Sequence, residues 1–319
     1  MSSEPSIAVA IPVYNEAEVL PRLLSRLRAV LDAMGGGPHQ MVFVDDGSSD
    51  DTVELLEKAA REDPRVMVIA LTRNFGHQAA LTAALDHAEG DVTIVMDADL
   101  QDPPEAIPAL LERYHQGFDV VYAQRIGRKE SLALRLSYVV FYRLIAGLAD
   151  IALPLDAGDF GLMSRRVVQQ LRITRERHRY LRGLRSWVGF RQIGVPVERG
   201  ERAAGRSKYS VLGLIRLASD GLFAFSTAPL KAASLIGLGA IAAAVVYAIY
   251  SVYAKFVLHR SPQGFTALVL IITFLSGVNL LFLGIIGEYL GRVYQEVKAR
   301  PIYVIDRMIG RSPRQGRGA

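Results

Sequence analysis

Short apolar runs alternate with longer amphipathic runs over the first two hundred residues of the chain. The apolar runs have the length of strands, and the amphipathic runs repeat every three or four positions, as helices do. Strands are predicted at residues 7–13, 41–46, 66–71, 92–97 and 119–124, and helices from residue 16, at 52–60, at 78–88 and from residue 103. This alternation predicts an α/β fold, in which a parallel sheet is covered on both faces and binds ligands beyond the carboxyl ends of its strands.

Two polar patterns indicate where helices begin. Asn15 and Glu18 have the spacing of a capping box, which predicts a helix from Glu16. Asp102 precedes two prolines, and Glu105 follows them. This is the pattern of a capping carboxylate followed by a first helical turn that carries an acid. Asp102 therefore has a structural explanation and needs no role in a site.

Two long apolar segments, residues 232–254 and 265–287, contain no charged side chain. Each exceeds the roughly 20 residues that a helix needs to cross a bilayer. Buried core helices are the alternative, but the two segments lie close together in the sequence, and tyrosines gather at the outer end of the first like an interfacial belt. Basic residues follow the second segment and mark the cytoplasmic side. We expect a transmembrane hairpin in the inner (cytoplasmic) membrane, with the N-terminal domain and both termini in the cytoplasm.

These patterns predict four regions along the chain. They are an α/β domain at 1–204, juxtamembrane interfacial helices at 205–231, the transmembrane hairpin at 232–290 and a basic cytoplasmic tail at 291–319. Within residues 208–225, Val211, Ile215 and Leu222 share one helical face, which favours a helix lying on the membrane surface. Beyond Arg311 the basic composition predicts disorder.

The composition narrows the possible chemistry. The 319 residues include no cysteine, which excludes disulfides, thiolate zinc sites and cysteine nucleophiles. The 37 Lys and Arg outnumber the 32 Asp and Glu, so the net charge is +5. This charge gathers beside the apolar segments, which favours anionic lipid or phosphorylated substrates over nucleic acid. The chain has no P-loop and no GxSxG motif, and the six histidines show no metal spacing, so we expect His77 to be structural.

Acidic residues follow two of the predicted strands. Asp45 and Asp46 end one, and Asp97 and Asp99 end another. Two carboxylates that lie two residues apart on an extended chain point to the same side and repel unless a cation lies between them. With the side-chain amide of Gln101 they would hold Mg²⁺ or Mn²⁺, provided that a diphosphate completes the ligand shell. The pattern therefore predicts a nucleotide substrate, with Asp45 or Asp46 accepting hydrogen bonds from the edge of the base.

Eight motifs, in order along nearly the whole chain, carry a resemblance to a known family. They are IPVYNE, VDDGSSDDT, RNFGHQAAL, DADLQDPPE, GDFGLMSRR, RGLRSWVGF, AGRSKY and GEYLGRVYQEVKARPIY. The chain resembles the GT-A glycosyltransferases of family 2, and within them the membrane-anchored group that includes bactoprenol glucosyltransferases, undecaprenyl-phosphate aminoarabinose transferases and dolichyl-phosphate mannose synthases. Arg206 in AGRSKY departs from the pattern, because relatives often have an acid there.

The resemblance implies both a fold and an activity. The fold would be a GT-A catalytic domain, with a Rossmann-like mixed, mostly parallel sheet, followed by interfacial helices and the transmembrane hairpin. The activity would be transfer of a sugar from a nucleotide-diphosphate sugar to a polyprenyl phosphate such as undecaprenyl phosphate, with a UDP-sugar favoured over a GDP-sugar, although the motifs specify neither the base nor the sugar. The reaction would depend on Mg²⁺ or Mn²⁺ and invert the anomeric carbon, and the enzyme is expected to form a homo-oligomer.

The resemblance also implies roles for individual residues. The nucleotide pocket would include Pro12, Tyr14, Glu16, Asp45, Asp46 and Asp97. Asp97, Asp99 and Gln101 would hold the metal, and Asp99 and Asp159 would be the catalytic residues, with Asp159 a candidate base. The acceptor phosphate would be bound by Arg125, Arg128, Arg135, Arg202, Ser207 and Lys208.

Two alternative functions are compatible with parts of this pattern. A processive polysaccharide synthase of the same family would share the fold, but such enzymes resemble chains with a QxxRW motif and more membrane helices. Here the segment RSW at residues 185–187 lacks the glutamine at the required position. A non-catalytic scaffold or sugar-nucleotide sensor would also bind nucleotide, although the intact acidic residues oppose it. Measured turnover separates these alternatives.

Overall fold

The computed structural model describes residues 4–126, 157–177, 179–198, 228–257 and 264–310. The chain forms two compact units. The first comprises residues 1–142, 151–210 and 300–319, and the second comprises residues 143–150 and 211–299. The first unit contains the sheet and the second contains the long apolar helices, so each is described by itself.

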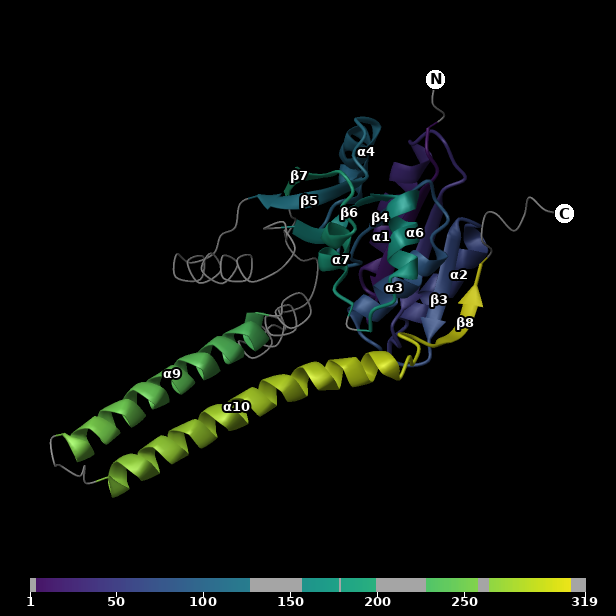
Figure 1. Ribbon diagram of the computed structural model, residues 1–319. Coiled ribbons are helices and arrows are strands. Elements are labelled where there is room, and N and C mark those ends of the chain that lie inside the picture. Colours follow the sequence, from purple (N-terminus) through teal and green to yellow (C-terminus); the bar gives the residue numbers. More distant parts are fainter. Residues whose placement is uncertain (1–3, 127–156, 178, 199–227, 258–263, 311–319) are drawn as a thin grey trace. The chain divides into compact units, whose positions relative to one another are not determined.

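An eight-stranded sheet forms the centre of the first unit (Figure 1). Its strands are β1 (Ile7–Val13), β2 (Gln40–Asp45), β3 (Val66–Leu71), β4 (Val92–Val95), β5 (Val120–Ile126), β6 (Ala157–Ser164), β7 (Gln192–Glu198) and β8 (Ile305–Ile309). Their spatial order is β7-β5-β6-β4-β1-β2-β3-β8. Only β6 and β8 run antiparallel to their neighbours. The predicted α/β fold with a mixed, mostly parallel sheet is confirmed.

Helices cover both faces of this sheet. They are α1 (Leu20–Asp32), α2 (Thr52–Glu62), α3 (His77–His87), α4 (Ile107–His115), α6 (Arg165–Ile173) and α7 (Leu181–Trp187). Along β1, Val9 and Ile11 pack in one apolar core with α1, α2 and α4, whereas Ala10 packs in a second core with α3, α6 and α7. This alternation follows from the pleat, which turns successive side chains to opposite faces. The strands are buried on both faces and therefore read as continuous apolar runs.

The predicted capping box at Asn15 is wrong. Helix α1 begins at Leu20, and no side chain caps it. Asn15 adopts a left-handed conformation with φ of 55°, and its side-chain oxygen accepts the backbone N–H of Ser49 at 2.8 Å. The amide oxygen thus links the two loops that follow β1 and β2, and tertiary contact overrides the local capping pattern.

The predicted cap at Asp102 is also not found. A 3₁₀ turn at Pro104–Ala106 precedes α4, and neither element has a side-chain cap. Glu105 instead pairs with the guanidinium of Arg26 on α1, with Arg26 Nε 2.8 Å from a carboxylate oxygen. The acid of the expected first turn therefore ties this loop to a neighbouring helix.

The C-terminal segment returns to the sheet, a feature without a signal in the sequence pattern. Strand β8 pairs antiparallel with β3, and the N–H of Thr72 donates to the carbonyl oxygen of Val304 at 3.0 Å. The hydroxyl of Tyr303 donates to Asp86 at 2.8 Å, and Arg307 pairs with Glu57 at 3.0 Å. Part of the region predicted as a basic tail is thus a strand. The stretch predicted to be disordered, beyond Arg311, lies outside the described residues.

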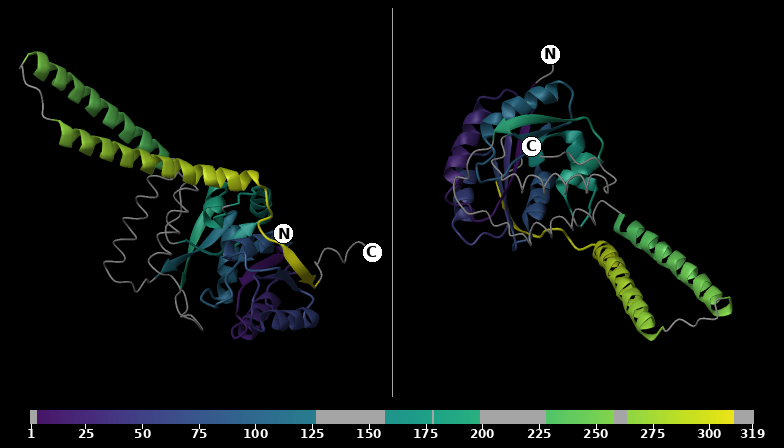
Figure 2. Two further views of the ribbon diagram at one scale, coloured as in Figure 1. Left: turned by 90° about the horizontal axis from the view of Figure 1, so that it is seen from below. Right: turned by 90° about the vertical axis from the view of Figure 1, so that its left-hand side faces the viewer.

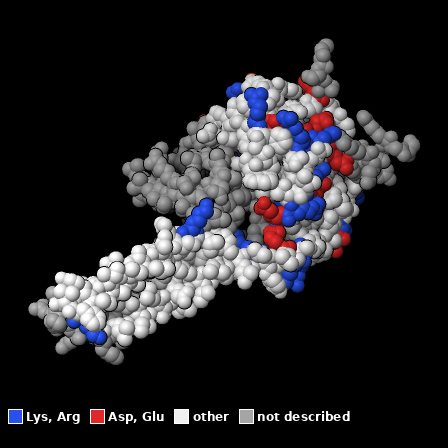
Figure 3. Space-filling view, viewed as in Figure 1, with Lys and Arg blue, Asp and Glu red and all other residues white. Residues whose placement is uncertain are grey.

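Two long helices, α9 (Ala228–Phe256) and α10 (Phe265–Val297), form the second unit (Figures 1 and 2). Both contain windows that are long and apolar enough to cross a membrane, Leu230–Phe256 and Ile271–Val297, with mean hydropathies of 2.2 and 1.8. In these two stretches only Ala233 and Ala254 are buried among the described side chains, which opposes the alternative of core helices. One face of the pair shows almost no charged side chains (Figure 3). The predicted interfacial helices at 205–231 lie mostly outside the described residues.

Replacing Tyr303 by Phe removes the hydroxyl that donates to Asp86 and keeps the ring. We expect the free energy of unfolding of the sheet domain to fall by about 1 kcal/mol, the usual net contribution of one hydrogen bond. Thermal denaturation of the full chain in detergent measures this change. Met308→Ala is the control, because Met308 lies on β8, is 44% exposed and should leave the midpoint unchanged. An equal loss in both variants would contradict a specific role for the hydroxyl.

Candidate functional site

Polar residues from four strands meet at one edge of the sheet. The parallel strands β1, β2 and β4 all end there. Strand β6 runs antiparallel to β4, with Val95 opposite Gly161, so it begins at the edge where β4 ends. Continuing this register by two residues on each strand brings Asp97 and Asp159 to the same level. The two acidic candidates from distant parts of the sequence are therefore neighbours because of strand direction.

Asp45 and Asp46 hold the loops around this edge. One oxygen of Asp45 accepts the backbone N–H groups of Gly47 and Ser48, both at 3.1 Å, while the other is buried without a hydrogen-bond partner. The two oxygens of Asp46 accept the N–H groups of Phe75 and Gly76 at 2.7 and 2.9 Å. Burial raises the pKa of Asp46, although both backbone N–H groups oppose the increase. Asp46 therefore fixes the β3–α3 loop, and Asp45 keeps a free acceptor atom.

Close packing of backbone in these loops requires a glycine. Gly47 has φ of +73°, and a Cβ there would lie 2.7 Å from backbone atoms of Arg73 and Asn74. Across the neighbouring loop, the N–H of Glu16 donates to the hydroxyl of Thr52 at 2.9 Å. The loops after β1, β2 and β3 are thus connected into one rim.

The predicted nucleotide residues from the first strand lie on this rim. Pro12 is buried within β1, and Tyr14 follows the strand with 45% of its surface exposed. An exposed aromatic ring beside a polar rim is suited to stacking on a base.

Asp97 is paired with His77, at the start of α3. His77 Nε2 lies 2.9 Å from a carboxylate oxygen of Asp97, and the imidazole is 44% exposed. Burial disfavours the imidazolium, but the hydrogen bond and charge of Asp97 outweigh burial and raise the pKa of His77. The prediction that His77 is merely structural is therefore too narrow, because its ring lies within the candidate site. Its position directly after the β3 strand end was the available signal.

Asp97, Asp99 and Gln101 are the candidate residues for a divalent cation at this edge. Asp99 accepts the N–H of Gln101 at 3.1 Å, which turns the loop tightly after Asp97. Within the described residues no three His, Asp or Glu side chains are grouped closely enough to hold a metal by themselves. The two carboxylates are those of Asp97, which is 30% exposed, and Asp99. A hard cation held by so few carboxylates takes its remaining ligands from water and a diphosphate.

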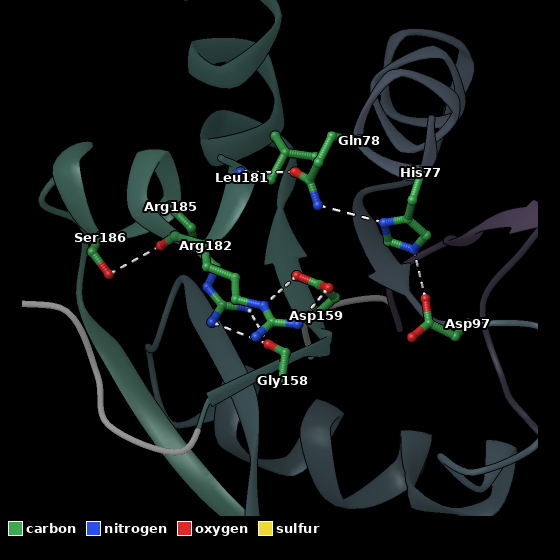
Figure 4. A network of polar contacts seen from close by, with 9 residues as sticks. All are labelled: His77, Gln78, Asp97, Gly158, Asp159, Leu181, Arg182, Arg185 and Ser186. Carbon is green, nitrogen blue, oxygen red and sulfur yellow. Dashed lines mark hydrogen bonds and ion pairs between the residues drawn. The ribbon is translucent and has the colours of Figure 1, made fainter. Parts of the chain in front are cut away.

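Asp159 forms a bidentate salt bridge with Arg182 on α7 (Figure 4). Both contacts measure 2.7 Å, and the Asp159 side chain is only 8% exposed. Burial disfavours its charge, but the guanidinium outweighs burial and holds the pKa of Asp159 below its usual value. Gln78 connects this pair to the first, since its side-chain oxygen accepts the N–H of Leu181 at 3.0 Å and its amide lies 3.4 Å from His77.

The structure adds residues that the sequence analysis did not select and leaves others undescribed. Arg182, Arg185 and Gln78 lie in or beside the site (Figure 4), and the i, i+3 spacing of the two arginines in RGLRSW was their only signal. Arg125 lies on β5, but its side chain is not described. The other predicted acceptor residues lie outside the described residues, namely Arg128, Arg135, Arg202, Ser207 and Lys208.

Comparison with solved structures gives distant similarities. Mannosyltransferase PcManGT from Pyrobaculum calidifontis, in complex with GDP-Man and Mn²⁺, is 18% identical with a TM-score of 0.47, covering 88% of each chain. Glucosyl-3-phosphoglycerate synthase from Mycobacterium tuberculosis, in complex with Mn²⁺, UDP and its product, is 20% identical with a TM-score of 0.44, covering 68% of this chain and 76% of that one.

Comparison of sequences gives much stronger similarities. An uncharacterized glycosyltransferase of Bacillus subtilis, YkcC, is 41% identical over 97% of this chain and 96% of its own length. A bactoprenol glucosyl transferase from a Shigella flexneri prophage is 39% identical over 94% of this chain and 97% of its own. An undecaprenyl-phosphate 4-deoxy-4-formamido-L-arabinose transferase of Pseudomonas paraeruginosa is 36% identical over 96% and 91%. The model of glycosyl transferase family 2 matches residues 8–172. The chain therefore belongs to glycosyltransferase family 2.

Proposed function

We propose that this glycosyltransferase moves a sugar from a nucleotide-diphosphate sugar to a polyprenyl phosphate, with undecaprenyl phosphate as the expected acceptor, at the cytoplasmic face of the inner membrane. The observation that carries the proposal is the combination, in one chain, of an acidic strand-end site and two exposed apolar helices of membrane-spanning length. Relatives named as bactoprenol and undecaprenyl-phosphate transferases, similar over nearly the whole chain, support it.

The donor is assigned to the rim formed by the loops after β1, β2 and β3, together with the loop after β4. Pro12, Tyr14, Glu16 and the free oxygen of Asp45 would contact the nucleoside, with a uridine base preferred over guanosine. Asp97, Asp99 and Gln101 would hold Mg²⁺ or Mn²⁺, which when bound neutralises the charge of the leaving diphosphate. Asp46 would act indirectly, because both of its oxygens already accept backbone N–H groups.

The acceptor needs little activation. A phosphate monoester has its second pKa near ~6, so at neutral pH much of it is dianionic and already nucleophilic. In-line attack of its oxygen on the anomeric carbon inverts that centre, and positioning and charge stabilisation then supply most of the catalysis. Asp159 is a poor base, since its pKa is lowered and both of its oxygens contact Arg182. We assign it to orienting Arg182 and the acceptor.

The apolar helices would hold the enzyme at the bilayer, where the acceptor lipid is found. A polyprenyl chain is insoluble in water, so its phosphate is presented only at the bilayer surface, and an anchored enzyme searches a small local volume for it. In this proposal α9 and α10 span the membrane, residues 205–231 lie on its surface, and both termini are cytoplasmic. Arg125, Arg128, Arg135, Arg202, Ser207 and Lys208 would bind the lipid phosphate. Assembly into a homo-oligomer stays a prediction.

Replacing Asp99 by Ala tests the metal-dependent transfer. The purified chain in detergent is given labelled UDP-glucose, UDP-GlcNAc or GDP-mannose with undecaprenyl phosphate and Mn²⁺. We expect a glycolipid product whose rate falls at least ~100-fold in Asp99→Ala and equally with EDTA, because the diphosphate loses its counter-charge. Glu105→Ala is the control, since Glu105 lies in the same segment and is solvent-exposed.

Other results of this assay would favour other functions. Release of nucleoside diphosphate without glycolipid would indicate a different acceptor or a processive synthase. Nucleotide binding without turnover, for every donor offered, would contradict the proposal and favour a sensor.

Replacing Asp159 by Asn tests whether it is a base. We expect turnover within about tenfold of the wild type and an unchanged pH–rate profile, because the acceptor phosphate is already ionised. Loss of 10²- to 10⁴-fold together with an altered pH–rate profile would instead assign it as a general base. Asp119→Asn is the control, because Asp119 is equally buried, pairs with Arg166 away from the site and should affect only thermal stability.

A further inference from the structure

Arg185 is a buried guanidinium with few partners. The residue is 4% exposed, and its Nε has no hydrogen-bond partner. Its two terminal nitrogens lie 3.5 Å from the carbonyl oxygen of Gly158, at the outer limit for a hydrogen bond. The remaining contact is with the ring of Tyr122, 5.3 Å from the guanidinium carbon. Burial lowers the pKa of Arg185 to about 10, which is the signature of a charge removed from water without full compensation.

The charges around Arg185 do not balance. The negative charge of Asp159 acts on Arg185, but both oxygens of Asp159 are engaged by Arg182. In the part of the chain that the structure describes, no carboxylate forms a salt bridge with Arg185. Arg182 and Arg185 therefore lie beside one carboxylate that is hydrogen-bonded to Arg182 alone, while Asp97, whose charge also acts on Arg182, is paired with His77. Buried charges are normally paired, and an unpaired one costs stability.

Arg185, the guanidinium without a carboxylate partner, lies near the proposed reaction centre. Arg182 and Arg185 occupy one face of α7, three residues apart, and Gln78 connects the start of α7 to His77 and so to Asp97. Both arginines and Asp159 also border a cavity that is too small for a phosphoryl group, and its other walls are apolar, among them Leu81, Val95 and Met163. Apolar walls exclude water and strengthen charge interactions at such a place.

We propose that Arg182 and Arg185 form a phosphoryl-binding subsite on α7. This inference rests on the proposed function and deepens it. Arg182, whose side chain is 32% exposed, would meet the phosphoryl group first, and Arg185 behind it would supply the second cation. The planar guanidinium presents a fork of donors that matches phosphate oxygens. The ligand is either the diphosphate of the donor or the phosphate monoester of the acceptor, and the test separates these two sources.

A purely structural role for Arg185 predicts a different stability. If Arg185 mainly supports the Gly158 carbonyl, replacing it by Met would lower the melting temperature. If it is kept for an anion, the same replacement removes an unpaired buried charge with little change of volume. The melting temperature would then stay the same or rise while binding falls, as is common for residues retained for function.

The experiment measures stability and binding on the full chain in detergent. Wild type, Arg185→Met, Arg185→Lys and Arg172→Met are compared by thermal denaturation and by calorimetric titration with inorganic diphosphate and with undecaprenyl phosphate. We expect Arg185→Met to bind one of these probes about 10- to 100-fold more weakly, the range for charge-assisted hydrogen bonds, with an unchanged or higher melting temperature. If only diphosphate binds more weakly, the subsite binds the donor. If only undecaprenyl phosphate binds more weakly, the subsite binds the acceptor.

The control and the conservative variant make the outcome decisive. Arg172 caps α3 by donating from Nε to the carbonyl oxygen of Leu85 at 2.8 Å, so Arg172→Met should lower the melting temperature and leave both affinities within twofold. Arg185→Lys keeps the charge but loses the fork, and it should bind more weakly without unfolding. If Arg185→Met unfolds, the affinity of Arg185→Lys for the two probes tests the subsite instead.

The subsite and the proposed function can fail separately, because the probes require no turnover. Unchanged affinity in both Arg185 variants, or no binding of either probe to the wild type, overturns the subsite. Binding by the wild type without glycolipid formation would leave the subsite in place and contradict only the proposed reaction.

Discussion

The antiparallel pairing of β6 with β4 is the contact on which the site depends. In a purely parallel sheet, a strand following β5 would begin at the far edge and carry Asp159 away from Asp97. The reversed strand instead brings its first residues to the edge where β1, β2 and β4 end. Helix α7 then supplies Arg182 to Asp159, and α3 supplies His77 to Asp97. One change of strand direction thus places two charged pairs, from distant segments of the sequence, beside each other.

Some charged groups at this edge are paired within the chain, and others are not. Asp97 is paired with His77 and Asp159 with Arg182, but no described carboxylate forms a salt bridge with the buried Arg185, and one oxygen of Asp45 is buried without a hydrogen-bond partner. Such groups lower the stability of the free protein, since desolvation is not repaid within the chain. In the proposed function, a substrate with phosphate oxygens and polar base edges would supply the missing partners.

The strands and their acidic ends were predictable because they are local patterns. The runs that form β1 to β4 are mostly apolar, and Asp45, Asp46, Asp97 and Asp99 lie at or just beyond their ends. The misses arise where distant segments decide the structure. Asn15 fits a capping box, yet it turns to meet Ser49. His77 and Arg182 gain their meaning from partners 20 and 23 residues away in sequence but adjacent in space. Strand β8 has no length or pattern that distinguishes it from a polar tail.

Strand β8 also changes how the sheet meets other molecules. Without it, β3 would present the unbroken apolar sequence VMVIAL as a free edge, with unpaired backbone groups of the kind that recruit strands from other chains. The covering strand is only five residues long and carries Asp306 and Arg307, and the opposite edge strand β7 contains Pro196. Both edges are therefore poor templates for further pairing. Residues 305–309 thus cover the edge of β3, and a domain truncated before them would expose an edge that favours aggregation.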